Sequence, residues 1–322
     1  MTPFTDQVDQ QVQHVGEQAL IRHIEEWLGE TNPPSPAGMG DDAAVVPTQV
    51  GQRILTKDSL VYGKHFDKTA SPEEVGGKLL KRNLSDLAAM GALPGQAVLA
   101  CLLPPMTSLH WLNGFYTGLR NCAKEFNVTI VGGDISSTFQ DLAFTLTLLG
   151  TGAENSLTRR SAKNGDTLWV TGSLGGSILK KHLQFTPRLK EGAWLATQPS
   201  VSSGMDLSDG LATDLHHLCP PNSIFKIDTD TIPISKDAIT LSKESGNEAI
   251  HHALTDGEDY ELLFTLSSEI NPIDFANEWR GQFNTNITCI GKVMTPGTEE
   301  NHPIQYLGSY SPTTEKGYEH FR

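Results

Sequence analysis

The chain has 322 residues, a length that favours two domains. Its 38 acidic and 24 basic residues give a net charge of −14, which argues against a protein that grips a nucleic-acid backbone through positive charge. No apolar run approaches the roughly 20 residues of a membrane-spanning helix, and the N-terminus has no signal-peptide pattern. The 4 cysteines lack metal-site spacing. We therefore expect a reduced, cytoplasmic protein that binds neither nucleic acid nor membrane.

The first part of the chain leads from a polar segment into a helix and then a strand. Residues 1–15 are polar and Gln-rich, which predicts a flexible lead-in. Apolar residues at helical spacing predict a helix over residues 17–28. A Pro- and Gly-rich loop follows, and Asp42 lies at its end, directly before an apolar run. A strand is predicted over residues 54–61, and it carries Asp58.

The stretch from residue 71 to residue 91 has the clearest helix start and stop signals in the sequence. Ser71 and Glu74 form a capping-box pattern at its start, and Gly91 is suited to end it. Leucines at helical spacing supply an apolar stripe, and Asp86 lies beside that stripe. Taken alone, this Asp is typical of a solvated residue on an amphipathic helix.

The remainder predicts more strands and helices in both halves. Further strands are predicted at residues 96–103, 128–131, 142–150, 167–171, 224–227, 232–234, 262–265 and 287–293. Helices are predicted over residues 109–126 and from about residue 211 to 218. A sharp turn is expected at Gly132, Gly133 and Asp134. The mixture predicts an α+β or α/β protein, with a second unit that begins near Gly152.

Seven aspartates lie at predicted turns or at the ends of apolar runs along the sequence. They are Asp41, Asp42, Asp58, Asp86, Asp134, Asp206 and Asp209. Carboxylates are hard oxygen ligands that suit Mg²⁺, and several of them converge only if cations neutralise their charge. Such a site fits phosphoryl transfer. Each Asp-Gly or Gly-Asp pair taken alone is nevertheless more typical of an ordinary turn.

Other motifs are absent or ambiguous. The sequence has no P-loop and no dinucleotide-binding fingerprint. The glycine loop from Gly172 to Ser177 could hold a phosphate, although a structural turn from strand to helix is the stronger interpretation. The histidine pairs 216–217 and 251–252 lack H-x-x-x-H spacing, which favours solvated or capping histidines over a metal site.

Several segments in this order resemble the thiamine-monophosphate kinase family, over nearly the whole chain. They are GMGDDAAVV, DSLVYGKHF, KRNLSDLAAMGALP, VGGD, LTRRSAKNGD, MDLSDGL, DGEDYELLF and KGYEHF. The resemblance implies the two-domain fold of aminoimidazole ribonucleotide synthetase. It divides the chain into a lead-in (1–15), an N-terminal ATP- and Mg²⁺-binding and dimerisation domain (16–152), and a C-terminal domain that contributes nucleotide and substrate contacts (153–322).

The resemblance also implies an activity. It is direct in-line transfer of a phosphoryl group from ATP to thiamine monophosphate, assisted by several Mg²⁺ ions, to give thiamine diphosphate. The partners it implies are the two substrates and a second copy of the chain, paired through the N-terminal domains. No side chain is expected to act as a general base, because the attacking phosphate oxygen is already largely deprotonated at pH 7.

The resemblance assigns roles to individual positions. The expected metal ligands are Asp42, Thr56, Asp58, Asp86, Asp134, Asp206 and Asp209. The expected ATP contacts are Gly133, Asp134, Arg159 and Ser208. The expected contacts to the thiamine substrate are His65, Glu258 and Tyr318. Without the resemblance, a surface Arg, a turn Glu and a packed tail aromatic would be the better interpretations of Arg159, Glu258 and Tyr318.

Two positions depart from the family pattern. Lys57 stands where Thr is usual, which leads us to expect fewer bound Mg²⁺ ions, because a protonated ammonium cannot ligate a metal. Asp256 stands where Gly is usual, which raises the question of how the substrate loop is shaped. The alternatives are a non-catalytic nucleotide-binding regulator of the same fold and another ATP-dependent synthetase of the superfamily.

Overall fold

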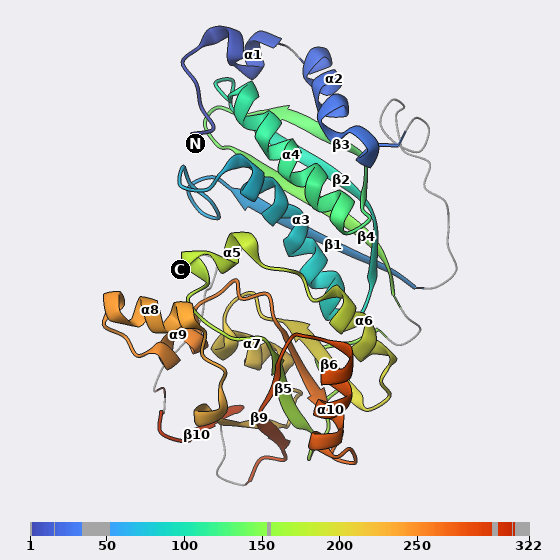
Figure 1. Ribbon diagram of the computed structural model, residues 1–322, viewed down its shortest axis with the longest axis vertical. Coiled ribbons are helices and arrows are strands. Elements are labelled where there is room, and N and C mark those ends of the chain that lie inside the picture. Colours follow the sequence, from blue (N-terminus) through green and yellow to red (C-terminus); the bar gives the residue numbers. More distant parts are fainter. Residues whose placement is uncertain are drawn as a thin grey trace. The chain divides into compact units, whose positions relative to one another are not determined.

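The computed structural model describes residues 2–15, 17–33, 52–152, 156–297, 302–310 and 312. Backbone contacts divide the chain into two compact units (Figure 1). The first comprises Met1–Leu87 and Leu93–Gly152, and the second comprises Ala88–Ala92 and Ala153–Arg322. In the described part of the chain, no helix is both long enough and apolar enough to cross a bilayer.

The first unit is built on a four-stranded sheet with the order β1-β4-β2-β3. Its strands are β1 (Gln52–Val61), β2 (Leu93–Leu103), β3 (Thr129–Ser137) and β4 (Ala143–Gly152). β2 and β3 are parallel, whereas β4 pairs antiparallel with both β1 and β2. The two edges of the sheet are therefore β1 and β3, the strands that carry Asp58 and Asp134.

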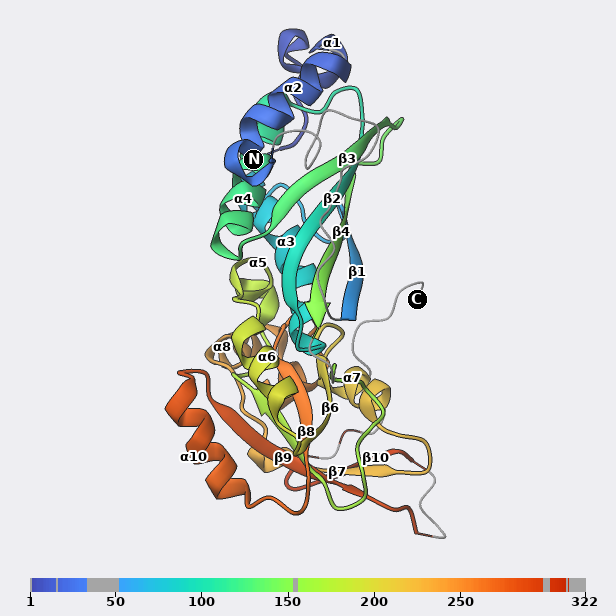
Figure 2. The same cartoon turned by 90° about the vertical axis from the view of Figure 1, so that its right-hand side faces the viewer.

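Helices cover one face of this sheet (Figure 2). The helical elements of the unit are η1 (Val8–Gln10), α1 (Val12–Val15), α2 (Glu17–Leu28), η2 (Gly29–Thr31), α3 (Pro72–Ala89) and α4 (Leu109–Glu125). The predicted capping box opens α3. Ser71 N donates to Glu74 Oε2 at 3.0 Å, and Glu74 N donates to Ser71 Oγ at 3.2 Å.

Glycines let α3 and α4 pack backbone against backbone. A Cβ on Gly76 would collide with the carbonyl oxygen of Phe115, and one on Gly118 would collide with that of Glu73. Only glycine permits helices to approach this closely, so the sequence fixes where α3 crosses its neighbour. This contact sets the position of the helix that carries Asp86.

Aromatic side chains fill the space between these helices and the sheet, while no helix of the described residues covers the other face (Figure 2). Phe115 on α4 stacks on Phe144 of β4 with ring centroids 4.0 Å apart, and Trp111 lies against both. The side chains that alternate to the opposite face include Leu55, which is 68% exposed, and Val98, which is 42% exposed. The sheet thus buries one apolar face and leaves apolar residues on the other.

The second unit holds a six-stranded sheet with the order β10-β7-β9-β5-β8-β6. Its strands are β5 (Thr167–Thr171), β6 (Val201–Asp206), β7 (Ile224–Asp228), β8 (Leu262–Leu266), β9 (Ile287–Met294) and β10 (Ile304–Leu307). Its helical elements are η3 (Ser177–Leu179), α5 (Lys181–Gln184), α6 (Leu189–Thr197), α7 (Leu211–Leu218), η4 (Thr229–Thr231), α8 (Lys236–Ser245), α9 (Ala249–Thr255) and α10 (Pro272–Gln282).

Because side chains alternate along each strand, the two faces of this sheet pack into two separate hydrophobic cores. Leu168 and Val170 of β5 join a buried cluster with residues of α7 and α9. Trp169, between them in sequence, packs on Phe275 of α10, which also lies near Trp194 of α6. The sheet is therefore covered by helices on both faces, which confirms the mixed α/β class.

Most predicted elements are present. The sequence did not predict β6, α6, α8, α9 and α10, and the lead-in expected over residues 1–15 contains η1 and α1. Other segments also differ from the prediction. The segment 132–134 is not a sharp turn, because it continues β3 through a register shift opposite Ala97 and Val98. Residues 232–234 form no strand beyond one isolated bridge between Ile234 and Leu174. The short strand β10 was not predicted, because its four residues, IQYL, lie in a polar segment that masks their pattern.

Candidate active site

Three oxygen-bearing side chains converge where β1 meets α3. Thr56 and Asp58 are two residues apart and point to the same face of the strand. Thr56 Oγ1 donates a hydrogen bond to Asp86 Oδ2 of α3. One helical turn earlier, Arg82 forms an ion pair with Asp58, with 3.0 Å between Nη2 and Oδ1. The helix thus supplies both an acid and a balancing cation to the same stretch of β1.

His65 is held in a fixed orientation just after β1. Its ring Nδ1 accepts a hydrogen bond from Val61 N at 3.1 Å, so in the neutral ring the hydrogen lies on Nε2. The carbonyl oxygen of His65 accepts from Lys78 Nζ at 3.0 Å, and Lys78 is fully buried. The loop that follows β1 is thereby tied to α3.

Gly133 and Asp134 lie at the opposite edge of the sheet from this cluster. β3 is separated from β1 by β2 and β4, which places the two edges about 14 Å apart at ordinary strand spacing. A Cβ on Gly133 would collide with the carbonyl oxygen of Leu99, so glycine is required there for close strand pairing. One chain alone does not bring Asp134 to Thr56, Asp58 and Asp86.

Lys57 does not enter the cluster within one chain. Because successive side chains of a strand alternate, it points to the opposite face from Thr56 and Asp58, and it is exposed. Its ammonium group therefore does not take a cation's place between those two residues. The hypothesis of a reduced Mg²⁺ complement stays a prediction.

In the second unit, backbone hydrogen bonds join two loops that carry predicted site residues. Leu207 N donates to Glu261 O at 2.8 Å, Tyr260 N donates to Leu207 O at 2.8 Å, and Glu258 N donates to Ser208 O at 2.7 Å. These bonds place Ser208 beside Glu258 at one edge of the sheet, where β6 ends and β8 begins. Asp206, at the end of β6, is buried at 4% exposure.

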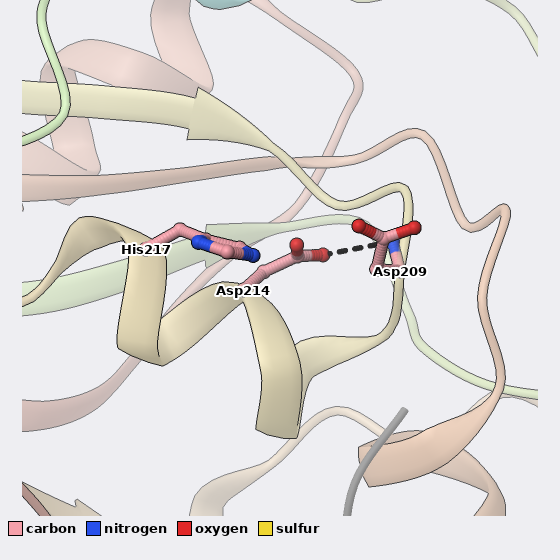
Figure 3. A group of neighbouring side chains, drawn as sticks. All are labelled: Asp209, Asp214 and His217. Carbon is pink, nitrogen blue, oxygen red and sulfur yellow. Dashed lines mark hydrogen bonds between the residues drawn. The ribbon is translucent and has the colours of Figure 1, made fainter. Parts of the chain in front are cut away.

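A buried carboxylate fixes the turn between β6 and α7. Asp214 Oδ2 accepts hydrogen bonds from the backbone nitrogens of Ser208 and Asp209, both at 3.1 Å (Figure 3). Burial raises the pKa of Asp214 well above its ordinary value, and the charges of Asp206 and Asp209 raise it further. Three acids thus lie close together at the start of α7, in a segment that the sequence places among the site residues.

The loop that carries Glu258 has an unusual backbone. Glu258 and Tyr260 have φ angles of 63° and 51°, in the left-handed region that residues other than glycine seldom adopt. The Tyr260 hydroxyl donates to Glu258 Oε1 at 3.0 Å, and its ring stacks on Phe185. Such strain persists where surrounding contacts impose it, and it is concentrated at functional sites.

Asp256 anchors this loop to the glycine loop after β5. Its Oδ2 accepts a hydrogen bond from Gly176 N at 2.7 Å, and its Oδ1 lies 3.1 Å from His252 Nδ1. Next along the chain, Asp259 Oδ2 accepts from Gly175 N at 2.9 Å. Asp256, which departs from the family pattern, is therefore held in the loop by its own hydrogen bonds. The glycine segment serves this packing, and the elements directly after it are the 3-10 helix η3 and the four-residue helix α5.

A buried ion-pair network lies beneath these loops. Arg188 donates to both carboxylate oxygens of Glu261, each at 2.8 Å, and Lys181 Nζ lies 3.0 Å from Glu261 Oε1. Burial alone would raise the pKa of Glu261, but the bonds and charges of Arg188 and Lys181 outweigh burial and lower the pKa. The network holds the end of the loop in one arrangement.

We expect Arg188→Ala to lower the free energy of unfolding by about 3 kcal/mol, because it removes the bidentate partner of a buried carboxylate. Lys181 remains near Glu261, which keeps the loss at the lower end of the usual range for such pairs. Urea unfolding followed by tryptophan fluorescence measures the change. Arg188→Lys keeps the charge and should lose less. Equal stability of Arg188→Ala and the parent chain would contradict this account of the network.

The remaining predicted residues lie apart or outside the described residues. Arg159 is exposed in a turn, next to Thr158, whose carbonyl oxygen accepts from Gly204 N of β6. Asp42 and Tyr318 lie outside the residues that the structure describes.

Three residues at these sites were not singled out from the sequence. Arg82 lies four residues before Asp86, a spacing that places both on one helix face and could have indicated their shared role. Asn83 is fully buried, and its Oδ1 has no hydrogen-bond partner in the described part of the chain. Asp214 follows Asp209 by five residues, and no simple motif predicts its hydrogen bonds back to the turn.

Comparison with known proteins places the chain among its relatives. Residues 40–153 match the family model described as AIR synthase related protein, N-terminal domain. The thiamine-monophosphate kinase of Escherichia coli K12 is 33% identical over 334 aligned residues, covering 95% of this chain and 98% of that protein. The one from Rhodopirellula baltica is 34% identical and covers 80% and 83% of the two chains.

Solved structures agree with these relatives. The thiamine-monophosphate kinase of Stenotrophomonas maltophilia K279a has a TM-score of 0.74 at 29% identity, over 89% of this chain and 95% of that one. A structure described as AaThiL complexed with AMPPCP and TMP has a TM-score of 0.69 at 28% identity, over 92% and 94%. The hydrogenase maturation protein HypE, with a TM-score of 0.74 at 17% identity, shares the fold. The chain belongs to the thiamine-monophosphate kinase family.

Proposed function

We propose that this chain transfers the terminal phosphoryl group of ATP to thiamine monophosphate, giving ADP and thiamine diphosphate by direct in-line transfer. The observation that carries the proposal is the convergence of Thr56, Asp58 and Asp86 at the contact of β1 with α3, in a chain of this family. A related structure binds AMPPCP and TMP, which supports the same pair of substrates here.

Mg²⁺ fits the residues of the first unit. The donors there are a hydroxyl and carboxylates, the hard oxygen ligands that Mg²⁺ prefers, and His/Cys clusters are not among them. We propose that Thr56, Asp58 and Asp86 hold Mg²⁺ together with Asp42. Asp134 and Asp206 are further proposed Mg²⁺ ligands, and Asp209 is a proposed ligand of a divalent metal ion. When bound, Mg²⁺ would neutralise charge on the transferring phosphoryl group.

The protein's own part is then to position the two substrates. The attacking phosphate oxygen of thiamine monophosphate is largely deprotonated at pH 7, so no side chain has to remove a proton. We propose Gly133, Asp134, Arg159 and Ser208 as ATP contacts, since a guanidinium and backbone donors suit phosphate oxygens. Holding donor and acceptor in line supplies much of the rate enhancement in such reactions.

We propose His65, Glu258 and Tyr318 as the contacts to the thiamine part of the acceptor. The carboxylate of Glu258 can accept hydrogen bonds from an aminopyrimidine or balance the thiazolium charge. Its left-handed backbone and its bond to Tyr260 hold it in one orientation, which supports a role in recognition. An aromatic ring such as that of Tyr318 is suited to stacking on a flat heterocycle.

We also propose a homodimer formed through the first unit. The open face of its sheet exposes Leu55, Leu93, Val98 and Leu102, and its edge strands are β1 and β3. Free edges and apolar faces are usually covered in a working assembly. A twofold axis that pairs β1 of one subunit with β3 of the other closes both edges together. Asp134 would then lie beside the partner subunit's β1, where the Thr56 and Asp58 positions are.

A cytoplasmic location is part of the proposal. All four cysteines are free, and burial raises the pKa of the Cys101 and Cys122 thiols to about 12, so neither is a reactive thiolate at neutral pH. This pattern is typical of a protein in a reducing compartment.

The activity is tested by incubating the purified chain with ATP, Mg²⁺ and an acceptor, and measuring ADP together with the thiamine products by chromatography. We expect thiamine diphosphate from thiamine monophosphate, no product from thiamine, and no turnover after Mg²⁺ is removed with a chelator. ATP binding without product from thiamine monophosphate would favour the regulator, which shares the fold but has no turnover.

Asp256→Ala tests the substrate loop. Because this change leaves Gly176 N without its acceptor, we expect the KM for thiamine monophosphate to rise several-fold, with a stability loss of about 1–2 kcal/mol. Asp256→Asn keeps an oxygen at the same place and should retain most of the affinity. Steady-state kinetics at saturating ATP separate KM from kcat, and an unchanged KM in Asp256→Ala would show that this anchor does not shape the site.

A further inference from the structure

We propose that Asp209, Asp214 and His217 form a binding site for one divalent cation with a mixed nitrogen and oxygen ligand set, of the Mn²⁺ type. Each residue offers one ligand atom, and these atoms lie within 4.8 Å of one another. Asp209 belongs to the turn after β6, while the other two come from α7 (Figure 3). The proposal deepens the proposed function, on which it rests only for Asp209, one of the expected metal ligands.

The environment of Asp214 indicates that its carboxylate binds a cation. The residue is 1% exposed, and one of its two oxygens, Oδ2, is already bonded to the backbone of the turn. The other oxygen, Oδ1, is buried and has no hydrogen-bond partner among the residues that the structure describes. A buried acceptor that stays unpaired costs about 1–3 kcal/mol, and a bound cation removes that cost. Figure 3 shows this carboxylate between His217 and Asp209.

Helical spacing explains why α7 supplies two ligands. Asp214 and His217 are three residues apart, so both project from the same side of the helix. The bonds from Asp214 to the backbone of Ser208 and Asp209 draw the Asp209 side chain to the same place. Asp214 is buried, Asp209 is half-buried and His217 is exposed, so the group opens to solvent on the imidazole side.

The chemistry of the ligands selects the class of cation. Mn²⁺ is a hard ion that takes carboxylate ligands, and as a transition metal it also accepts an imidazole nitrogen, whereas Mg²⁺ prefers an all-oxygen set. Three protein ligands also leave positions for water or for an anion. The adjacent turn holds Ser208, a proposed ATP contact, so a phosphate oxygen is a suitable further ligand. This ligand set differs from the oxygen cluster of Thr56, Asp58 and Asp86.

The test uses the full chain, freed of metal, with Mn²⁺ added and no nucleotide present. Pulsed electron paramagnetic resonance detects ¹⁴N modulation when a histidine nitrogen is bound to Mn²⁺. We expect this modulation in the parent chain and its loss in His217→Ala. The Mn²⁺ affinity at that site should fall at least about tenfold, because loss of a mere outer-shell partner of a metal ligand already costs about 10–100-fold. Asp214→Asn should also weaken binding.

His216→Ala is the matched control, because it removes the neighbouring exposed imidazole and leaves the three ligands in place. It should keep the ¹⁴N modulation. Absence of the modulation in the parent chain at saturating Mn²⁺, or its persistence in His217→Ala, would overturn the proposal. Circular dichroism checks that each variant is folded. Phosphoryl transfer with Mg²⁺ is measured separately, so a chain that binds Mn²⁺ here but lacks turnover would refute the kinase proposal alone.

Discussion

Replacement of Asp86 by Asn is expected to reduce turnover by about 10³-fold or more while the chain stays folded. The change removes one negative charge from a group that we propose as a shared Mg²⁺ ligand. Loss of such charge stabilisation costs several kcal/mol in the transition state, and each 1.36 kcal/mol is a factor of ten in rate. Asn retains the size of the side chain and an acceptor for Thr56, so packing of α3 on β1 should persist.

Glu73→Gln is the matched control, since it neutralises an exposed acid at the other end of the same helix. It should leave turnover within a factor of about two, as expected for an exposed charge. The kinase assay at saturating substrates and Mg²⁺ gives kcat, and thermal unfolding reports the fold. Near-normal turnover in a folded Asp86→Asn chain would remove this residue from the proposed metal site.

The second large effect is complementation between subunits. Two variants that are each inactive alone should regain activity when they form mixed dimers. Asp58 and Asp134 lie on opposite edges of the sheet, so an intact site in the proposed dimer takes Asp58 from one subunit and Asp134 from its partner. Asp58→Asn and Asp134→Asn should each abolish most turnover. Dimers that combine the two variants contain one site with both changes and one intact site.

Co-refolding or co-expression of the two variants in equal amounts should therefore recover about a quarter of the parent activity, since about half of random dimers are mixed. Analytical ultracentrifugation verifies that dimers form. The control is a mixture of Asp58→Asn with Asp86→Asn, whose residues lie in the same cluster and should not complement. No recovery in the first mixture would show that Asp58 and Asp134 do not meet across the subunits.

Local features of the fold were predictable because their causes are local. The capping box at Ser71 and Glu74 and the apolar stripe between them and Gly91 predict α3 nearly to its ends, and the structure confirms it as Pro72–Ala89. The apolar runs at β2, β4 and β8 likewise predicted strands from the sequence. In these segments local preference and tertiary environment agree.

Features set by contacts distant in sequence were not predictable. Gly132, Gly133 and Asp134 are typical of a turn, but pairing with β2 keeps them in a strand. Which acids meet was also beyond the sequence, because the order β1-β4-β2-β3 separates Asp134 from Asp58 although both follow apolar runs. The resemblance gave roles to the residues, and the sheet order decides which of them one chain can bring together.

Asp214 and His217 illustrate the same limit within one short segment. The sequence favoured a solvated histidine, and His217 is indeed exposed. What the sequence does not contain is the fold of the turn after β6, which bends back so that Asp214 bonds to Ser208 and Asp209. The ligand group exists only once that turn is formed.

The most direct test of the central claim follows the phosphoryl group itself. ATP labelled with ³²P at the γ position is incubated with the chain, Mg²⁺ and thiamine monophosphate, and the label is traced by chromatography. The account predicts that the label appears in thiamine diphosphate in an amount equal to the ADP formed. Label released as inorganic phosphate, with no labelled thiamine diphosphate, would contradict it.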